Sequence, residues 1–321
     1  MDHEAAATEL LRAMRGKRSQ LALSRRLGLR SNAVYRWEAG RAWPTAQQLF
    51  RMARVTGRSV IEPLKAFAGA AHVGALETPR GAATLLETLA QPFTVQALAK
   101  KLGVSRFVLS RWLSGKSAIR LPELLRFVET TTLRLLDFIA LFVDPAHLPS
   151  LSVAFRRLTA ARATAYDVPW SHAILRALEL EDYRKLGRHE TGWLGRRIGV
   201  AQEEEERCIA LLVASGQIRR RRGRYVVAEA AVVDTSVDLV KRRALRAFWS
   251  SKAVERLSQG DPGLFGYNLF AIAEADIEKL QALYIEFFAK MRALVDASHP
   301  SQRVMLLATQ LVALDQPERE L

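Results

Sequence analysis

Cysteine is almost missing from this chain of 321 residues. Only Cys208 occurs, so no disulfide bond can form within the chain, and a reducing, cytoplasmic location is expected. Long apolar runs are missing too: the most apolar stretch, LRLLDFIALFV from Leu133, is short and carries Arg134 and Asp137, so it cannot span a bilayer. The N-terminal MDHEAAATELL is acidic and has no apolar signal-peptide core. We therefore expect a soluble cytoplasmic protein.

Residue patterns for catalysis and metal binding are missing as well. The SGKS at residues 114–117 resembles the end of a phosphate-binding loop, but that motif needs a glycine where Ser110 stands and a preceding strand. Cys208 falls on the apolar side of an expected helix, which is typical of an inert core thiol. The histidines lack the spacing of metal ligands and are His3, His72, His147, His172, His189 and His299. We expect no enzyme, no metal site and no other cofactor.

Acidic residues are scarce relative to basic ones, and the formal net charge is +15. The surplus lies mostly in residues 1–149, which hold 22 Lys and Arg against 11 Asp and Glu; residues 150–321 hold 26 against 22. A basic N-terminal half favours a polyanionic partner, nucleic acid first. A solvated basic surface without a partner, or a patch that faces a membrane, would give the same charge.

Strand signals are few, so the expected fold class is mainly α. The clear strand pattern is RRGRYVVAEAAVV, centred on residues 225–227, and nearly all the rest has helical periodicity. Stretches rich in alanine, glycine and proline divide the chain. We expect domains at residues 1–69, 84–149, 150–232 and 233–321, with a linker over residues 70–83.

One sequence segment occurs in two similar copies. LGLRSNAVYRWEAG from Leu27 recurs as LGVSRFVLSRWLSG from Leu102, an offset of 75 residues without a gap. In each copy a polar cap opens a helix, a glycine turns the chain, and a second helix follows; Ser19 and Thr94 are the expected caps. Each copy is therefore expected to be a helix-turn-helix.

The first copy has the residues that reading the major groove requires. Val34 and Trp37 are expected to pack inward, while short polar and cationic side chains face outward. The copy resembles the lambda-repressor-like family of the xenobiotic-response type in Gln20, Leu23, Ser24, Leu27, Gly28, Leu29, Val34, Trp37, Glu38, Gly40, Pro44 and Leu49. Arg30 departs from the family, which usually caps the recognition helix there with Ser or Thr.

The resemblance also implies roles for particular side chains. Gln20 would touch phosphate, and the residues that open the recognition helix would touch bases. The candidate DNA contacts of the first copy are Gln20, Arg30, Ser31, Asn32, Tyr35, Arg36 and Arg41.

The second copy keeps the arrangement with fewer of the family's residues. Ser105 is the expected cap of its recognition helix, but Val95 and Leu113 stand where the family has Gln and an acid. The candidate DNA contacts are Thr94, Ser105, Arg106, Phe107, Ser110, Arg111 and Lys116. The alternative is a structural duplicate that packs against the first copy and touches no DNA.

Residues 150–232 have a winged-helix pattern: a short helix ending at Gly199, a longer one from Glu203 to Ser215, and a basic hairpin. Arginines suit phosphate contact, and those of the wing are Arg219, Arg220, Arg221, Arg222 and Arg224. The helix that would enter the groove begins with four glutamates, residues 203–206, which phosphates would repel. We therefore expect a winged-helix scaffold that does not read bases.

The C-terminal half resembles a bacterial family of helix-turn-helix regulators that ends in a conserved domain of unknown function. The segments that carry this resemblance are WSHAILRAL, LLVASGQI, FAIAEADIEKL and RVMLLATQLVAL. It implies a bacterial transcription regulator without an established ligand. It also implies that VMLLATQLVAL is a strand, at the edge of the wing sheet.

Together these patterns predict two tandem lambda-repressor-like helix-turn-helix domains, then a winged-helix and a helical domain. The predicted function is a sequence-specific regulator, such as a repressor, on nucleoid DNA. A homodimer is expected through helices around Leu283, Phe287 and Phe288, and the C-terminal half would receive a small-molecule, peptide or protein effector. The alternatives are an adaptor that binds a partner protein and an RNA-binding regulator; RNA reading usually needs stacking aromatic residues, and no such platform is recognisable.

Overall fold

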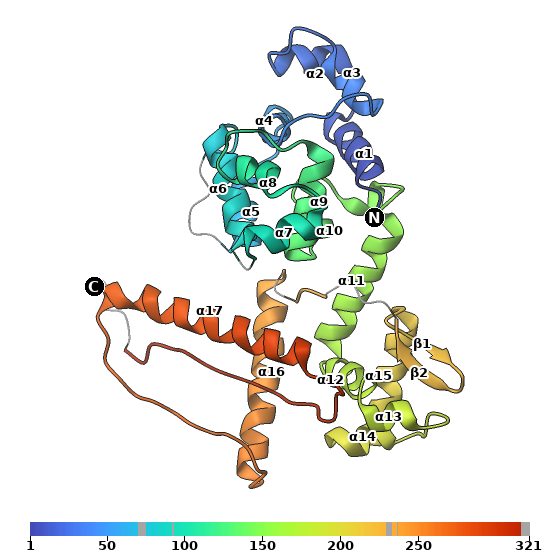
Figure 1. Cartoon of the computed structure of the whole chain (residues 1–321). Coiled ribbons are helices and arrows are strands. Elements are labelled where there is room, and N and C mark those ends of the chain that lie inside the picture. The colour runs from blue at the N-terminus through green and yellow to red at the C-terminus, as the bar shows by residue number, and fades with distance from the viewer. Residues whose placement is uncertain (70–74, 92, 229–232, 236, 316–321) are drawn as a thin grey trace, which may run out of the picture. The chain divides into compact units, whose positions relative to one another are not determined.

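The structure, a computed structural model, describes residues 1–69, 75–91, 93–228, 233–235 and 237–315, and it is mainly helical (Figure 1). It divides into two compact units, Met1–Thr159 and Ala160–Leu321, here called unit 1 and unit 2. The strands described form a single two-stranded sheet in unit 2. The mainly helical fold class is thus as predicted.

The regular elements in the described part of unit 1 are all helices. In chain order they are α1 (His3–Arg15), α2 (Gln20–Arg26), α3 (Ala33–Glu38), α4 (Ala46–Val55), α5 (Ile61–Ala68), α6 (Pro79–Ala90), α7 (Val95–Leu102), α8 (Arg106–Leu113), α9 (Leu121–Thr132), α10 (Leu135–Ala140) and a 3₁₀ turn at Pro145–His147. Helix α11 (Ser152–Asp167) runs across the boundary between the units.

Local chemistry fixes where the helix-turn-helix elements begin and end. The Ser19 hydroxyl accepts a hydrogen bond from the Ala22 amide at 3.1 Å, and Thr94 and Ser105 cap α7 and α8 in the same way, as predicted. The recognition helix of the first copy begins two residues later than Ser31, however, because Asn32 is its cap.

Buried side chains of both copies belong to one hydrophobic core. Helix α6 begins at Pro79, inside the stretch that the sequence marked as a linker. The loops that follow α3 and α8 also meet, in an antiparallel bridge between Thr45 and Arg120. The two copies therefore form one compact unit and share its apolar interior.

Unit 2 holds α12 (Trp170–Ala177), α13 (Glu181–Lys185), α14 (Trp193–Ile198), α15 (Gln202–Ala214), β1 (Ile218–Arg221), β2 (Arg224–Val227), α16 (Leu239–Ser258) and α17 (Glu274–Ala297). The core of unit 2 lies between α12–α15 and the hairpin. The hairpin turns at Arg222 and Gly223, both at positive φ (49° and 78°), as a two-residue turn between twisted strands requires. The strand predicted around residues 225–227 is confirmed.

The prediction of a strand over VMLLATQLVAL is wrong for this structure. Residues 301–314 are extended, but among the described residues only β1 and β2 pair as strands. An extended segment becomes part of a sheet only where a neighbouring strand offers its amides and carbonyls. The segment is apolar, as a strand would be, but the wing sheet does not supply a neighbouring strand for it.

Candidate nucleic-acid interface

Helix α3 presents a polar face and buries an apolar one. The side chains of Val34 and Trp37 are buried, whereas Arg36 and Tyr35 are exposed, Tyr35 by 45%. Arg30 and Ser31 are exposed just before the helix, and the Arg41 guanidinium lies 5.8 Å from the centre of the Tyr35 ring. The side chains that the sequence predicted to face outward thus form one surface, with Asn32 as the exception.

Asn32 and Gln20 are engaged within the protein. The Asn32 Oδ1 atom accepts hydrogen bonds from the Tyr35 amide and the Ser24 hydroxyl, both at 3.3 Å, so this side chain holds the start of α3. The Gln20 Nε2 atom donates to Glu38 Oε2 at 2.7 Å. The contacts predicted for these two residues with bases and phosphate would therefore compete with bonds that are already made.

Glu38 is the centre of a buried polar cluster that the sequence did not reveal. It is 3% exposed and accepts hydrogen bonds from Arg15 Nε at 2.6 Å and from Gln20. Arg12 donates to the Glu38 carbonyl at 2.7 Å. The cluster ties α1 and α2 to the end of α3, and so fixes the recognition helix on the unit.

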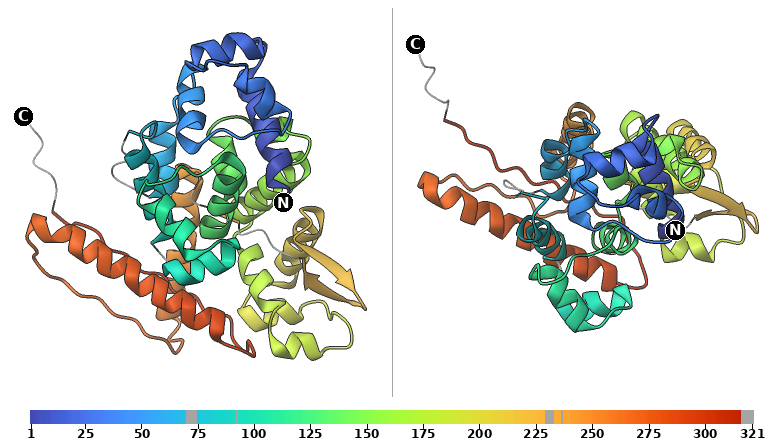
Figure 2. Two further views of the ribbon diagram at one scale, coloured as in Figure 1. Left: turned by 45° about the horizontal axis from the view of Figure 1, so that its top comes forward. Right: turned by 90° about the horizontal axis from the view of Figure 1, so that it is seen from above.

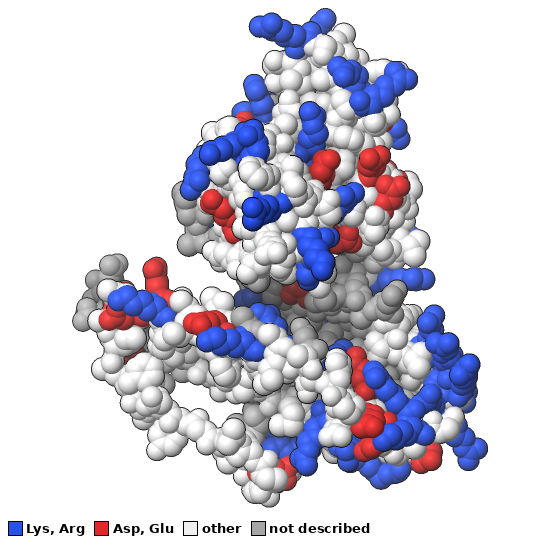
Figure 3. Space-filling model, in the orientation of Figure 1, with Lys and Arg blue, Asp and Glu red and all other residues white. Residues whose placement is uncertain are grey.

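The same cluster leaves the surface of the first copy positive. Residues 10–45 contain nine Lys and Arg, and their single acidic residue is the buried, paired Glu38. Figure 3 shows Lys and Arg side chains over the part of unit 1 that holds α2 and α3, with no acidic side chain among them on this face. A field of one sign attracts a polyanion before any specific contact forms.

Helix α8 presents a comparable but different face. Arg106, Phe107, Ser110 and Arg111 are exposed, Phe107 by 74%. The Thr94 and Ser105 hydroxyls accept hydrogen bonds from the Ala97 and Val108 amides and so cap α7 and α8. Lys116 is exposed beyond the helix, and residues 94–120 contain six Lys and Arg and no acid. The structure therefore brings the predicted residues of the second copy together on one surface.

In unit 2 the β1 side chains of Arg219, Arg220 and Arg221 are exposed, on both faces of the hairpin, and Arg222 is exposed in the turn. The predicted repulsion of phosphate by all four glutamates of α15 does not hold for Glu205. Its side chain is fully buried, and its Oε2 accepts the Gly195 amide at 2.5 Å. Glu205 thus joins α15 to α14, and only its neighbours remain to oppose phosphate.

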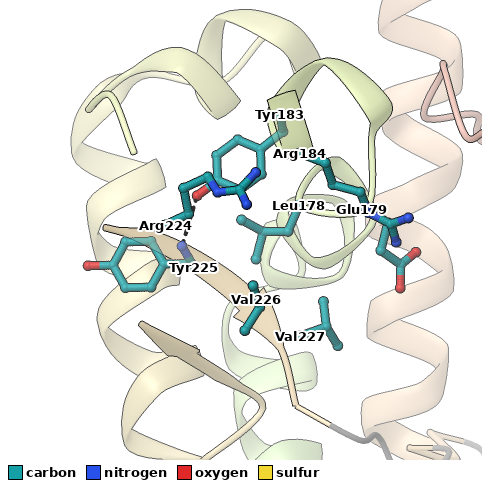
Figure 4. Close-up of a pocket in the computed structure, with 8 residues that line it drawn as sticks. All are labelled: Leu178, Glu179, Tyr183, Arg184, Arg224, Tyr225, Val226 and Val227. Atoms are coloured by element: carbon teal, nitrogen blue, oxygen red, sulfur yellow. Dashed lines mark hydrogen bonds between the residues drawn. The ribbon is translucent and has the colours of Figure 1, made fainter. Parts of the chain in front are cut away.

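A cavity of about 210 Å³ lies beside β2 (Figure 4). Tyr183 and Arg224 are among its lining residues, and the Tyr183 hydroxyl accepts a hydrogen bond from the Tyr225 amide at 3.1 Å. Small-molecule sites usually enclose about 300–1,000 Å³, so the size of this cavity alone does not identify an effector site.

Three further features of the described residues bear on the sequence predictions: the cysteine, clusters of metal ligands and apolar helices. Burial raises the pKa of the Cys208 thiol to about 12, as expected of an inert core cysteine. Within the described ranges, no three His, Cys, Asp or Glu side chains gather as a metal ion would need. No described helix has the length and apolarity to cross a membrane.

Unit 2 should lose stability as the pH falls below about 6.5, the ordinary histidine pKa. Burial lowers the pKa of His172, and Arg176 adds to the shift. Burial also lowers the pKa of His189, against the opposite effect of Glu205. The folded unit then binds fewer protons than the unfolded chain, so folding is favoured above the unfolded pKa and loses that support below it.

Thermal unfolding of the full chain at about pH 7.5 and 5.5 checks this. The transition of unit 2 should move to lower temperature at the acidic pH, and His172→Gln should reduce the difference. A difference that is the same in His172→Gln and in the native chain would exclude this role of His172.

Two family models match the chain. The model described as Helix-turn-helix matches residues 10–62, and the model described as Domain of unknown function (DUF4423) matches residues 152–314. No curated protein and no solved structure matches it.

Proposed function

The chain belongs to the family described as Domain of unknown function (DUF4423), and we propose that it is a transcription regulator that reads operator DNA through its helix-turn-helix. The observation that carries the proposal is the face of α3. It offers arginine and tyrosine side chains in a surface whose one nearby acid is buried and paired. Arginine binds guanine edges and phosphates, and a recognition helix of this kind fits the major groove.

Tyr35→Ala should weaken binding to the cognate site by about 1–3 kcal/mol, because the exposed ring and its neighbour Arg41 face the groove in this proposal. The site is first obtained from genomic fragments by gel shift. Binding should also weaken steeply with salt. The slope of the logarithm of the binding constant against the logarithm of the salt concentration should be about −0.9 for each phosphate that the protein neutralises.

Ile61→Ala is a suitable control, since Ile61 is 52% exposed on α5, outside the helix-turn-helix face. Binding of Tyr35→Ala to the cognate site as tight as that of the control would refute the role of α3. Capture of a protein in place of DNA would favour the adaptor, and tighter binding to RNA would favour an RNA regulator.

The winged-helix assignment for unit 2 is also part of this proposal. Helices α12, α14 and α15 share a core with the β1–β2 hairpin, in the order that a winged helix requires. The exposed wing arginines would touch flanking phosphates, whereas Glu203 and Glu206 at the start of α15 disfavour base reading. Unit 2 would then support DNA binding without specifying the sequence, and would remain free to receive an effector.

We propose further that the chain forms a homodimer through two extended arms and the helix between them. The arms are residues 262–273 and 301–314, on either side of α17. Two backbone–backbone hydrogen bonds are described for the arms: the Glu181 amide donates to the Ser301 carbonyl, and the Asp276 amide donates to the Ala273 carbonyl. The other described backbone groups of the arms have no backbone partner. Unpaired backbone in an apolar segment is a template for another strand.

The arms and α17 expose a large apolar surface. Leu264, Tyr267 and Met305 are exposed by 106%, 91% and 81%, and Leu283 and Phe287 on α17 by 61% and 50%. The exposed aromatic side chains of the region present roughly 400–700 Å² by themselves. Monomers rarely expose patches above about 300–600 Å², while a stable interface buries about 800 Å² per partner.

The composition of the arms favours a second copy as the partner. The stretches 262–273 and 304–314 contain no charged residue, so neither nucleic acid nor a charged peptide would be recognised there. Each copy supplies extended, apolar segments whose unpaired backbone groups could pair with the same segments of the other copy. A two-fold arrangement would cover both copies with the same contacts.

A further inference from the structure

Each helix of the first copy has a counterpart 75 residues later. Shifting α1 (His3–Arg15) by this offset gives residues 78–90, and α6 is Pro79–Ala90; shifting α4 (Ala46–Val55) gives residues 121–130, and α9 is Leu121–Thr132. Helices α2, α3 and α5 correspond in the same way to α7, α8 and α10. The repeat that is visible in the 14-residue sequence segment thus extends to all the helices of both copies.

The bridge between the copies is symmetric. The Ala46 amide donates to the Ile119 carbonyl, and the Leu121 amide donates to the Pro44 carbonyl, both at 2.9 Å. With the offset of 75, position 46 corresponds to 121 and position 119 to 44. Exchanging the copies therefore turns one bond into the other, as a half-turn between them would.

The helix packing follows the same exchange. Helix α1 of the first copy packs against α9 of the second, and α6 of the second packs against α4 of the first. In the left view of Figure 2, the α2–α3 pair and the α7–α8 pair lie at opposite ends of unit 1, with α4 and α9 between them. The half-turn seen in the bridge thus relates the helices as well.

From this symmetry we infer that unit 1 is a two-fold pair of helix-turn-helix copies within a single chain, which binds two half-sites of one DNA duplex. The inference rests on the proposed function. Helix-turn-helix proteins usually obtain two recognition helices by pairing two chains, and the two-fold axis of the pair then matches that of the operator. Here one core and one bridge hold both helices on the same chain.

The equivalent positions predict what kind of site is bound. Arg36 and Arg111 are equivalent and both exposed, so the two half-sites should share one guanine. Tyr35 corresponds to Ser110, and Ser31 to Arg106, so the neighbouring bases should differ. The predicted ligand is an inverted but unequal pair of half-sites, about one helical turn apart.

Matched variants of the full chain test this inference. Arg36→Ala and Arg111→Ala should each reduce affinity roughly ten- to hundredfold. In a hydroxyl-radical footprint each should lose protection in a different half-site. Arg157→Ala, an exposed residue of α11 away from both recognition helices, should bind as the native chain does.

Two results would overturn the inference. In the first, Arg111→Ala binds like the native chain while Arg36→Ala loses both half-sites, which would mean that two chains each read through α3. In the second, the native footprint covers a single half-site. Failure of the native chain to bind any DNA would instead refute the proposed function, and with it the premise of this inference.

Discussion

Glu38→Ala should lower the free energy of unfolding of unit 1 by about 3 kcal/mol, because it removes the buried carboxylate that pairs with the Arg15 guanidinium and accepts from the Gln20 amide, and leaves Arg15 only its bonds to the Gly16 and Arg18 carbonyls. Arg15 is 22% exposed and pairs with Glu38 at 2.6 Å. A buried charge that loses its partner is destabilising by far more than the net contribution of the intact pair.

The second copy provides the matched control. At the positions equivalent to Arg15, Gln20 and Glu38 it has Ala90, Val95 and Leu113. The triple variant Arg15→Ala, Gln20→Val, Glu38→Leu should therefore recover most of the stability that Glu38→Ala loses, since no buried polar group is left without a partner.

Urea unfolding of the full chain measures both variants. Glu62→Ala removes one partner of an exposed ion pair with Lys65 and should cost only about 0–1 kcal/mol. A loss for Glu38→Ala as small as that for Glu62→Ala, or a triple variant no more stable than Glu38→Ala, would contradict this account of the buried cluster.

Leu269→Asp and Leu311→Asp should each convert the homodimer to single chains. The two side chains lie in different arms and are exposed by 72% and 48% in one copy. A carboxylate buried between paired strands would lose its water without gaining a partner, so the dissociation constant should rise about 100-fold or more. Light scattering on the full chain gives the mass of the assembly.

Hydrogen exchange shows whether the arms themselves pair. Their amides should be protected in the native dimer and unprotected in both variants. Ile61→Asp, at a comparably exposed position on α5, should remain dimeric. A native chain that is monomeric, or variants that stay dimeric, would refute the arms as the interface.

The sequence predicted those parts of the fold that local chemistry determines. The caps Ser19, Thr94 and Ser105 and the wing strand were predicted correctly, because a hydroxyl beside free amides or an alternating apolar run acts over a few residues. The 75-residue repeat was equally visible. The exposed face of α3 followed from the spacing of its apolar residues.

What the sequence did not predict depends on contacts between distant residues. Nothing near Glu38 in the sequence indicates that Arg15 and Gln20 surround it, and Glu205 looks like its three exposed or half-exposed neighbours until α14 is placed beside it. The two-fold relation of the copies likewise required the bridge between Thr45 and Arg120. An apolar run such as residues 304–314 favours a strand, but the run itself does not determine which other strand would pair with it.

The most direct test of the central claim is to sequence the DNA that the full chain selects from a pool of genomic fragments. We predict that the selected fragments share an inverted pair of unequal half-sites, about one helical turn apart, with one guanine at the same position of each. Fragments without a shared sequence, retained only at low salt, would show that binding rests on charge alone and would contradict the claim that this protein reads an operator.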